Sequence, residues 1–460
     1  MDAAELGERL QALLHGDDPM PLWLDSAKPA AHDGSLSVLA SGCGALTVRY
    51  RLAGRRVSVA RLGRQCTAEP VFAARLPATD ARGDTVSFWT WMQDVYDHTR
   101  AAPSSGSSSG ARGLRFQGGW IGYFAYEMKD ECFGMTPPAH APAPPEEDND
   151  AAQRMPDAQL TFVDRCVVLD LGRSPPRATA LALVARPGAA PNADHPWLST
   201  LGFGSAQLAA AWAQEQAGRI RAWAAAAAAA PPAAPPGEAE APALRLRPVL
   251  PRDEYLGAIA RAKQQIARGE SYEICLTTQF RATLSGEQAI TTAQQMRRQY
   301  MRMRQASPAP HGALLWYGDL EAGVASCSPE RFLSIAPDAA AGARTVEMKP
   351  IKGTARRAPP PPRGPCAAHG HASLAAACAQ CRAQWAADDA RRAHALQTDV
   401  KERAENLMIV DLVRHDLGSV ADGCVEVPRL MHIESFAAVH QMVTTVRARV
   451  RPQAGNLAVL

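Results

Sequence analysis

The chain has 460 residues, which is too many for one ordinary hydrophobic core and favours two or three domains. Apolar residues make up 47% of the chain and the formal net charge is only +3, so neither a disordered protein nor a nucleic-acid-binding surface is expected. No run of about 18 apolar residues predicts a membrane span, and ten cysteines without a disulfide framework favour a reducing compartment.

The first half of the chain is predicted to be rich in strands. An acidic amphipathic helix is expected at the start, and its early acids argue against a signal or transit peptide. Apolar and β-branched patterns predict strands over residues 36–42, 46–52 and 160–172, and the aromatic segment 118–131 is expected to begin as a strand.

Four stretches rich in Pro, Gly, Ser or Ala interrupt the chain, at 101–113, 136–150, 224–242 and 358–365. The third marks the expected boundary between an N-terminal region, 1–243, and a second region, 244–460, which carries an insertion near 357–395. These compositions cannot build a core and are typical of linkers or surface insertions.

The second half is predicted to mix helices with strands. Amphipathic helices are expected over 251–269, ending near Gly269, and over 399–420, with Gly418 past the end. Strands are expected over 271–280 and twice within 312–336. The fold class is therefore predicted to be α+β, with large antiparallel sheets and helices outside.

Four charged or titratable side chains are candidates for chemistry. Glu402 and Glu405 lie three apart and share one helix face, which fits either a solvated surface or a Mg²⁺ site. Lys352 precedes Gly353 and becomes a nucleophile only if part of its amine is kept neutral; local sequence alone favours a surface lysine. Glu330 fits a general acid as well as an ion-pair partner of Arg331.

Two further patterns contain histidine. His440 lies in an apolar run, where a histidine is more often a core residue than a catalyst. A segment inside the expected insertion would permit a zinc site, although its spacing matches no standard finger and a low-complexity insertion is favoured. Its candidate ligands are Cys366, His369, His371, Cys378 and Cys381.

Four motifs in this order give a stronger signal than any of them alone: SPERF (328–332), PIKGT (350–354), KERAENLMIVDLVRHDLG (401–418) and VEVPRLMHIESFAAVHQMVTT (425–445). They resemble the chorismate-binding enzyme family that contains anthranilate synthase component I and aminodeoxychorismate synthase component I. The resemblance implies a large sandwich of two antiparallel sheets with outer helices and chorismate in a central cleft.

The residue before GT in the PIxGT motif separates the branches of this family. Anthranilate synthases carry alanine there, whereas this chain carries Lys352, as aminodeoxychorismate synthases do. The resemblance implies a transaminase-type transferase that converts chorismate and ammonia to 4-amino-4-deoxychorismate through a covalent lysine adduct, for p-aminobenzoate and folate. The alternatives are anthranilate synthase component I and a non-catalytic truncated paralogue. Glu273 at the position of a water-activating lysine argues against the hydrolytic branch.

The resemblance also implies roles for individual residues. Lys352 would be the nucleophile, Glu330 the general acid and base, and His440 a neighbour of the departing C4 hydroxyl. Gly353 and Thr354 would contact chorismate. The remaining positions are Glu405 as a Mg²⁺ ligand with Glu402 beside it, and Ser26 and Pro308 in a tryptophan pocket.

Two family features are not found in the sequence. A glutaminase motif of the GxCxGxQ kind is missing, so ammonia is expected from a separate or fused glutamine amidotransferase or from solution. The family's PGGSxTGAPK and RGxYxG segments are missing too, which implies a C-terminally truncated and nearly inactive member. A cytoplasmic location is expected, with a plastid as the alternative.

Overall fold

The computed structural model describes residues 3–27, 36–79, 86–99, 116–132, 155–185, 195–229, 245–284, 289–337, 343–359, 378–436 and 438–459. The chain forms two compact units, Met1–Arg221 with Thr292–Leu460, and Ala222–Thr291. This division differs from the boundary expected at 243/244, which falls inside the second unit. The physical reason is that β12 (His311–Tyr317) pairs with β1 (Pro21–Asp25), so one sheet uses both halves of the sequence.

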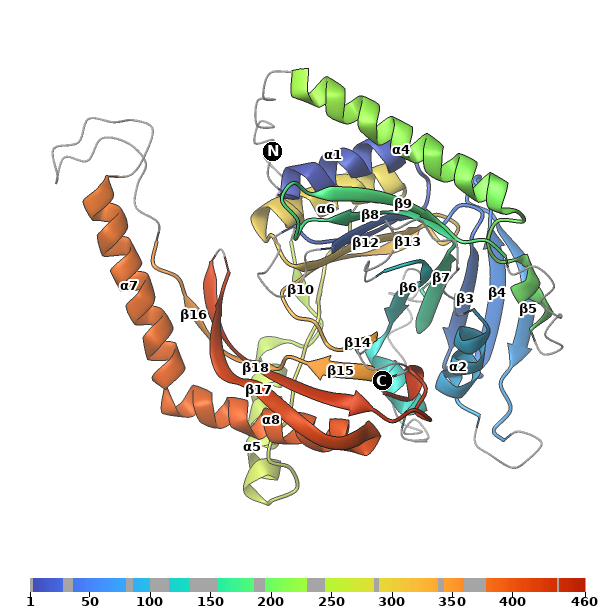
Figure 1. Cartoon of the computed structure of the whole chain (residues 1–460). Helices are drawn as coiled ribbons and strands as arrows, with labels where there is room; N and C mark the ends of the chain where they lie inside the picture. The colour runs from blue at the N-terminus through green and yellow to red at the C-terminus, as the bar shows by residue number, and fades with distance from the viewer. Residues whose placement is uncertain are drawn as a thin grey trace. The chain divides into compact units, whose positions relative to one another are not determined.

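A six-stranded antiparallel sheet opens the first unit and has the order β13-β12-β1-β2-β8-β9 (Figure 1). Helices α1 (Ala3–His15) and α6 (Ala293–Ala306) pack on this sheet. Its other strands are β2 (Leu36–Ser41), β8 (Arg165–Asp170), β9 (Arg177–Ala182) and β13 (Ala322–Ser328).

A second antiparallel sheet, of order β5-β4-β3-β7-β6, packs against the first. Ile121 and Val163 of this sheet share a buried cluster with Val38, Val168 and Leu315 of the first. Helix α2 (Phe88–Thr99) packs into a separate core cluster of this sheet. The strands are β3 (Leu46–Arg51), β4 (Arg56–Leu62), β5 (Ala68–Arg75), β6 (Gly119–Phe124) and β7 (Ala158–Val163).

The strand predictions for the first half are confirmed, with two refinements. The expected strand at 160–172 divides at Asp164, where the chain passes from β7 in one sheet to β8 in the other. The aromatic segment at 118–131 is a strand only as far as Phe124 and continues as the 3₁₀ helix η1 (Tyr126–Glu131).

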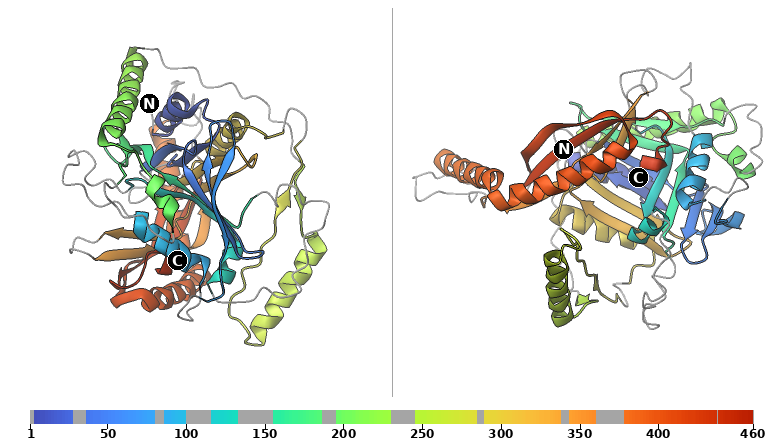
Figure 2. Two further views of the ribbon diagram at one scale, coloured as in Figure 1. Left: turned by 90° about the vertical axis from the view of Figure 1, so that its right-hand side faces the viewer. Right: turned by 90° about the horizontal axis from the view of Figure 1, so that it is seen from below.

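A third antiparallel sheet, β14-β15-β18-β16 with β17 also paired to β18, carries most of the motifs. Val410, Val413 and Leu417 of α8 (Val400–Val420) pack on Val346 and Val446 of this sheet, and Figure 2 shows the helix running along it. Gly418 lies inside α8 rather than past its end. The other elements are β14 (Ser334–Pro337), β15 (Arg344–Met348), β16 (Ile351–Arg356), β17 (Ala421–Ser435), β18 (Val439–Val450) and α7 (Ala379–Thr398).

The second unit contains α5 (Arg252–Ala267), which ends just before Gly269 as predicted. Gly269 has a left-handed φ of 81°, which is typical of a glycine that follows a helix. The strand expected over 271–280 is wrong. Only β11 (Phe280–Arg281) pairs, with β10 (Arg247–Pro248). A strand needs a neighbour for its backbone groups, and the described part of the chain offers this segment only those two residues.

Every strand ladder among the described residues is antiparallel, which confirms the α+β class with antiparallel sheets. Two sheets face each other and a third carries the motif residues. Within the same ranges, no helix has the length and apolar character needed to cross a membrane.

Asn406 fastens α8 to β18. Its Nδ2 donates to Met442 O at 3.3 Å, and its Oδ1 accepts from Thr444 Oγ1 at 2.7 Å, all in the core. Asn406→Ala leaves both partners without these bonds, and we expect it to lower the free energy of unfolding by about 1–3 kcal/mol. Urea unfolding measures this. Asp411→Ala, at a position on α8 that is 81% exposed, should change the free energy by under about 0.5 kcal/mol; equal losses would contradict the assignment.

Candidate functional site

Lys352 and Gly353 occupy a bulge in β16. The pairing of β16 with β18 shifts register between Ile351 and Thr354, and Gly353 has a φ of 89° that side-chain-bearing residues rarely adopt. Across the bulge, Lys352 Nζ lies 4.0 Å from Glu405 Oε1 on α8. The bulge therefore directs the predicted nucleophile toward one of the two predicted metal ligands.

Glu402 packs directly on this bulge. A Cβ added to Gly353 would lie 3.0 Å from Glu402 Oε2 and 3.2 Å from Leu396 Cδ1. A side chain at this position would therefore require Glu402 and Leu396 to shift by a few tenths of an ångström. The structure thus brings together Lys352, Gly353, Glu402 and Glu405, which lie some fifty residues apart in sequence.

The two carboxylates of α8 are held close to each other by a shared cation. Lys401 Nζ lies 3.2 Å from Glu402 Oε1 and 3.4 Å from Glu405 Oε2. Both carboxylates are partly exposed, and the Lys401 side chain, which is 77% exposed, can leave at little cost. Two carboxylates with access to water fit the ligand set of Mg²⁺. Among the described residues no group of three or more His, Cys, Asp or Glu could hold a metal.

Glu330 lies near the same bulge, in the turn after β13. Its backbone N–H donates to Ser328 Oγ at 3.2 Å, which fixes the turn. The residue is exposed overall, yet burial of its carboxyl group raises the pKa, against the opposing effects of the Ile351 N–H and the charge of Lys352. Arg331 donates to Glu347 at 2.6 Å. A carboxyl group with a raised pKa beside an amine is suited to proton transfer.

A shallow pocket, lined in part by Glu330, lies at this place. Lys349 and Glu434 line it as an ion pair, with 2.7 Å between Nζ and Oε1. Two hydrogen bonds lower the pKa of Glu434 to about 2: the bond from His432 has the larger effect, and the bond from Lys349 adds to it. The pocket therefore presents a fixed carboxylate and a fixed ammonium group close to the predicted acid–base residue.

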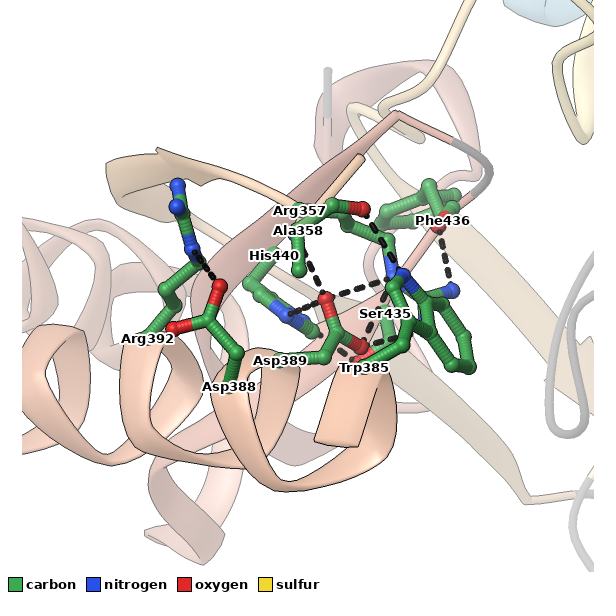
Figure 3. Close-up of polar contacts among 9 residues, drawn as sticks. All are labelled: Arg357, Ala358, Trp385, Asp388, Asp389, Arg392, Ser435, Phe436 and His440. Atoms are coloured by element: carbon green, nitrogen blue, oxygen red, sulfur yellow. Dashed lines mark hydrogen bonds and ion pairs between the residues drawn. The ribbon is translucent and has the colours of Figure 1, made fainter. Parts of the chain in front are cut away.

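His440 faces away from this pocket. Side chains alternate along a strand, so His440 and the pocket residue Val443 point to opposite faces of β18. The ring is buried, with Nδ1 2.8 Å from Ser435 Oγ and Nε2 3.1 Å from Asp389 Oδ1 (Figure 3). Asp389 also accepts hydrogen bonds from Arg357. Sequence reasoning missed Asp389 because no motif marks it and its burial is a tertiary property.

The expected insertion near 357–395 is regular in its described part, since 379–395 belongs to α7, which packs on β16 and β18. Cys378 caps this helix and its Sγ accepts the Cys381 N–H at 3.3 Å. The other residues of the candidate zinc site, Cys366, His369 and His371, lie outside the described residues. The zinc hypothesis stays a prediction.

Ser26 and Pro308, the predicted tryptophan-pocket positions, lie on adjacent segments, because Ala27 N–H donates to Ala309 O at 3.1 Å. Ser26 is buried, and its Oγ has no hydrogen-bond partner among the described residues. Beside it, the buried Asp25 carboxylate accepts hydrogen bonds from Tyr300, at 2.9 Å, and from Arg304. This polar cluster was not predicted from sequence. Tryptophan binding itself stays a prediction.

The contact between Gly353 and α8 can be tested by substitution. Gly353→Ala should cost about 1–2 kcal/mol for its backbone conformation and about 1–3 kcal/mol more for overpacking against Glu402 and Leu396. Gly423→Ala is the matched control, since Gly423 has a φ of 94° but open space at its Cβ. Urea unfolding compares the two. A loss for Gly353→Ala no larger than that for Gly423→Ala would argue against the close packing.

Comparison with known proteins places the chain in a family. Residues 64–460 match the model for chorismate binding enzymes. An aminodeoxychorismate synthase of Streptomyces griseus is 32% identical over 446 residues, 95% of this chain and 47% of that protein. One of Streptomyces pristinaespiralis is 32% identical over 456 residues, 97% of this chain and 50% of that protein. The chain thus spans about half the length of these relatives.

Among solved structures, anthranilate synthase component I from Streptococcus pneumoniae TIGR4 matches with a TM-score of 0.53 and 17% identity, over 93% of this chain and 71% of that chain. This likeness confirms the fold. Together with the match over residues 64–460, it confirms the resemblance carried by the four motifs: the chain belongs to the chorismate-binding enzyme family.

Proposed function

We propose that this chain forms the chorismate-binding part of an aminodeoxychorismate synthase, which makes 4-amino-4-deoxychorismate from chorismate and ammonia for p-aminobenzoate and folate. The observation that carries the proposal is Lys352, held on the Gly353 bulge within reach of Glu405 and beside Glu330. The names of the two Streptomyces relatives support the same activity.

Lys352 would act as a nucleophile in two displacements. Its amine forms a bond to ring C2 as the double bond shifts and the C4 hydroxyl leaves; ammonia then bonds to C4 and expels the lysine. The first step needs a proton at the departing C4 oxygen, the second needs one at the departing lysine nitrogen, and each step removes a proton from the attacking nitrogen. Glu330 is suited to both transfers, because burial raises its pKa and Lys352 lies close enough to oppose that rise.

Glu402 and Glu405 would hold Mg²⁺ together with substrate and water. Bound there, the ion would neutralise a carboxylate of chorismate. Lys401 now balances the charge of this pair and would give way to the ion. The bulge at Gly353, with Thr354 next to it, would border the substrate, since both lie on the strand that faces this carboxylate pair.

Partners follow from the same proposal. Ammonia would come from a glutamine amidotransferase, as a separate subunit or a fused domain. The Ser26 hydroxyl, which has no hydrogen-bond partner in the described part of the chain and lies on the segment adjacent to Pro308, would accept a polar ligand such as tryptophan. A cytoplasmic location fits the bacterial relatives, and a plastid is the alternative.

Lys352→Ala, made in the whole gene product, tests whether Lys352 is the nucleophile. We expect formation of 4-amino-4-deoxychorismate from chorismate, ammonia and Mg²⁺ to fall at least about 100-fold, and some anthranilate to form instead. Chromatography of the products measures both. Lys352→Arg is the matched control: it keeps the charge beside Glu405 but cannot lose a proton to attack. Activity retained in Lys352→Arg would show that only the charge matters.

Glu405→Gln tests the metal ligand. The change preserves shape and removes one anionic oxygen ligand, so the Mg²⁺ concentration for half-maximal product formation should rise about tenfold or more. Asp411→Asn, an equal charge change on the exposed face of the same helix, should leave that concentration unaltered. The same Mg²⁺ response in both variants would mean that the Glu402–Glu405 pair is only a solvated helix face.

A further inference from the structure

Three residues from three elements form a continuous hydrogen-bonded chain. Asp389 of α7 meets His440 Nε2 at 3.1 Å, and Ser435 of β17 meets His440 Nδ1 at 2.8 Å (Figure 3). His440 is only 2% exposed, whereas Ser435 is exposed. The chain therefore runs from a buried carboxylate, through a buried imidazole, to a hydroxyl at the surface.

The partners of Asp389 determine which ring nitrogen carries the proton. Arg357 Nε donates to Asp389 Oδ2 at 3.0 Å, and the Ala358 N–H donates to Oδ1 at 2.9 Å. The Arg357 guanidinium, more than any other group, holds the pKa of Asp389 well below its usual range. An ionised carboxylate only accepts, so His440 Nε2 bears a hydrogen, and in the neutral ring Nδ1 then presents its lone pair to the Ser435 hydroxyl.

Arg357 is itself fixed in place. Its Nη1 donates to Phe436 O at 3.1 Å, and its guanidinium lies 5.2 Å from the centre of the Trp385 ring. Trp385 Nε1 in turn donates to Ala358 O at 2.9 Å. Arg357, which directly follows β16, is thus held by Trp385 of α7 and by Phe436, which directly follows β17, and it in turn holds the Asp389 carboxylate.

We propose that Asp389 is a positioning residue that holds His440 in the Nε2–H tautomer, and that His440 exchanges its proton through the Ser435 hydroxyl. In one transfer, Ser435 Oγ gives its proton to Nδ1 as it takes one from the group on its exposed side. Only O–H and N–H bonds change. The imidazolium formed is stabilised by the Asp389 carboxylate, as in the Ser-His-Asp arrangement of serine proteases.

This inference deepens the proposed function and rests on it only for the substrate. His440 was expected to lie next to the departing hydroxyl of chorismate. Its two nitrogens are bonded to Asp389 and to Ser435, its register partner on β17, so both residues lie on the sheet face that points away from the pocket beside Glu330, and only Ser435 is exposed there. Contact with a ligand would therefore be made by Ser435 Oγ, with His440 behind it.

Nitrogen NMR of the ¹⁵N-histidine-labelled protein tests the tautomer without turnover. The signals of His440 are assigned among the twelve histidines by comparison with His440→Gln. We expect a protonated Nε2 and an unprotonated, hydrogen-bonded Nδ1 in the parent protein. A protonated Nδ1 in the parent would overturn the proposal before any other variant is made.

Asp389→Asn should move the proton. Its carboxamide oxygen would stay with Arg357 at the Oδ2 position, because an NH₂ group there would oppose the guanidinium donors. The NH₂ group then takes the Oδ1 position, gives up the bond from the Ala358 N–H and donates to Nε2, so the ring hydrogen passes to Nδ1. Asp388→Asn is the matched control, because Asp388 directly precedes Asp389 on α7, has a side chain that is 37% exposed, and pairs with Arg391 and with Arg392, the second of which Figure 3 shows. The parent tautomer should persist in it. Identical His440 spectra in both variants would overturn the role of Asp389.

Ser435→Ala tests the surface end and remains informative if Asp389→Asn fails to fold. We expect Nε2 to stay protonated, Nδ1 to lose its hydrogen bond, and kcat for chorismate to fall about 100-fold with little change in KM. Ser435→Thr, which keeps the hydroxyl, should restore kcat. An unchanged kcat in Ser435→Ala would overturn the route through Ser435. A parent with the Nε2–H tautomer but no turnover of chorismate would contradict the proposed function and support the positioning role.

Discussion

The close approach of α8 to the backbone at Gly353 is the contact on which the candidate site depends. Because Gly353 lacks a Cβ and has a positive φ, Glu402 can lie against the strand. The same bulge brings Lys352 within 4.0 Å of Glu405 and leaves the Ile351 N–H available to Glu330. One glycine thus sets the relative positions of an amine and three carboxylates, which explains why the motif couples a lysine to a Gly-Thr pair. In isolation each of these residues has an ordinary structural explanation; together they form a site only because the backbone is bent at this point.

β18 divides the chemistry of the third sheet between its two faces. On one face, Val443 borders the pocket that also contains Lys349 and Glu434. On the other face, His440, Met442 and Thr444 pack against α7 and α8, where Asn406 bonds to both Met442 and Thr444. A shift of one residue in the pairing of β18 would exchange the two faces and bury the pocket residues under the helices. The hydrogen bonds of Asn406 oppose such a shift, since they fit one register alone. This gives the asparagine of the AENLM segment a structural role that is separate from any role of its glutamate.

Sequence patterns predicted what depends on local periodicity and on motif order. Alternating β-branched residues gave most of the first-half strands, and the order of SPERF, PIKGT and AENLM identified the family and the Lys352 neighbourhood. They failed where the partner of a segment decides its structure. Residues 271–280 have strand-forming side chains but pair only at Phe280, because a ladder depends on a neighbour and not on propensity. The division into compact units differs from the expected boundary for the related reason that β1 pairs with β12 across almost three hundred residues. Asp389 was missed because a charged residue on a helix is usually solvated, and only the packing of α7 shows that this one is buried.

Two buried carboxylates in this chain are stabilised in the same way, and the comparison bears on how α7 is held. Asp25 is bonded to Arg304 and Tyr300, and Asp389 to Arg357 and His440. Burying such an ion is costly, and the attraction to its partner offsets that cost only when further hydrogen bonds complete the shell. Around Asp25 the surrounding sheet and α6 bury many apolar side chains as well, so the helix would be held without the ion. α7 differs, because Asp389 and Leu396 are its only buried residues among those described. The orientation of α7 therefore depends largely on polar contacts of fixed geometry. Asp389, which orients His440, thus also helps to fasten the helix, together with the buried Leu396 and the hydrogen bond from Trp385 to Ala358, so the tautomer of His440 and the docking of α7 share one carboxylate.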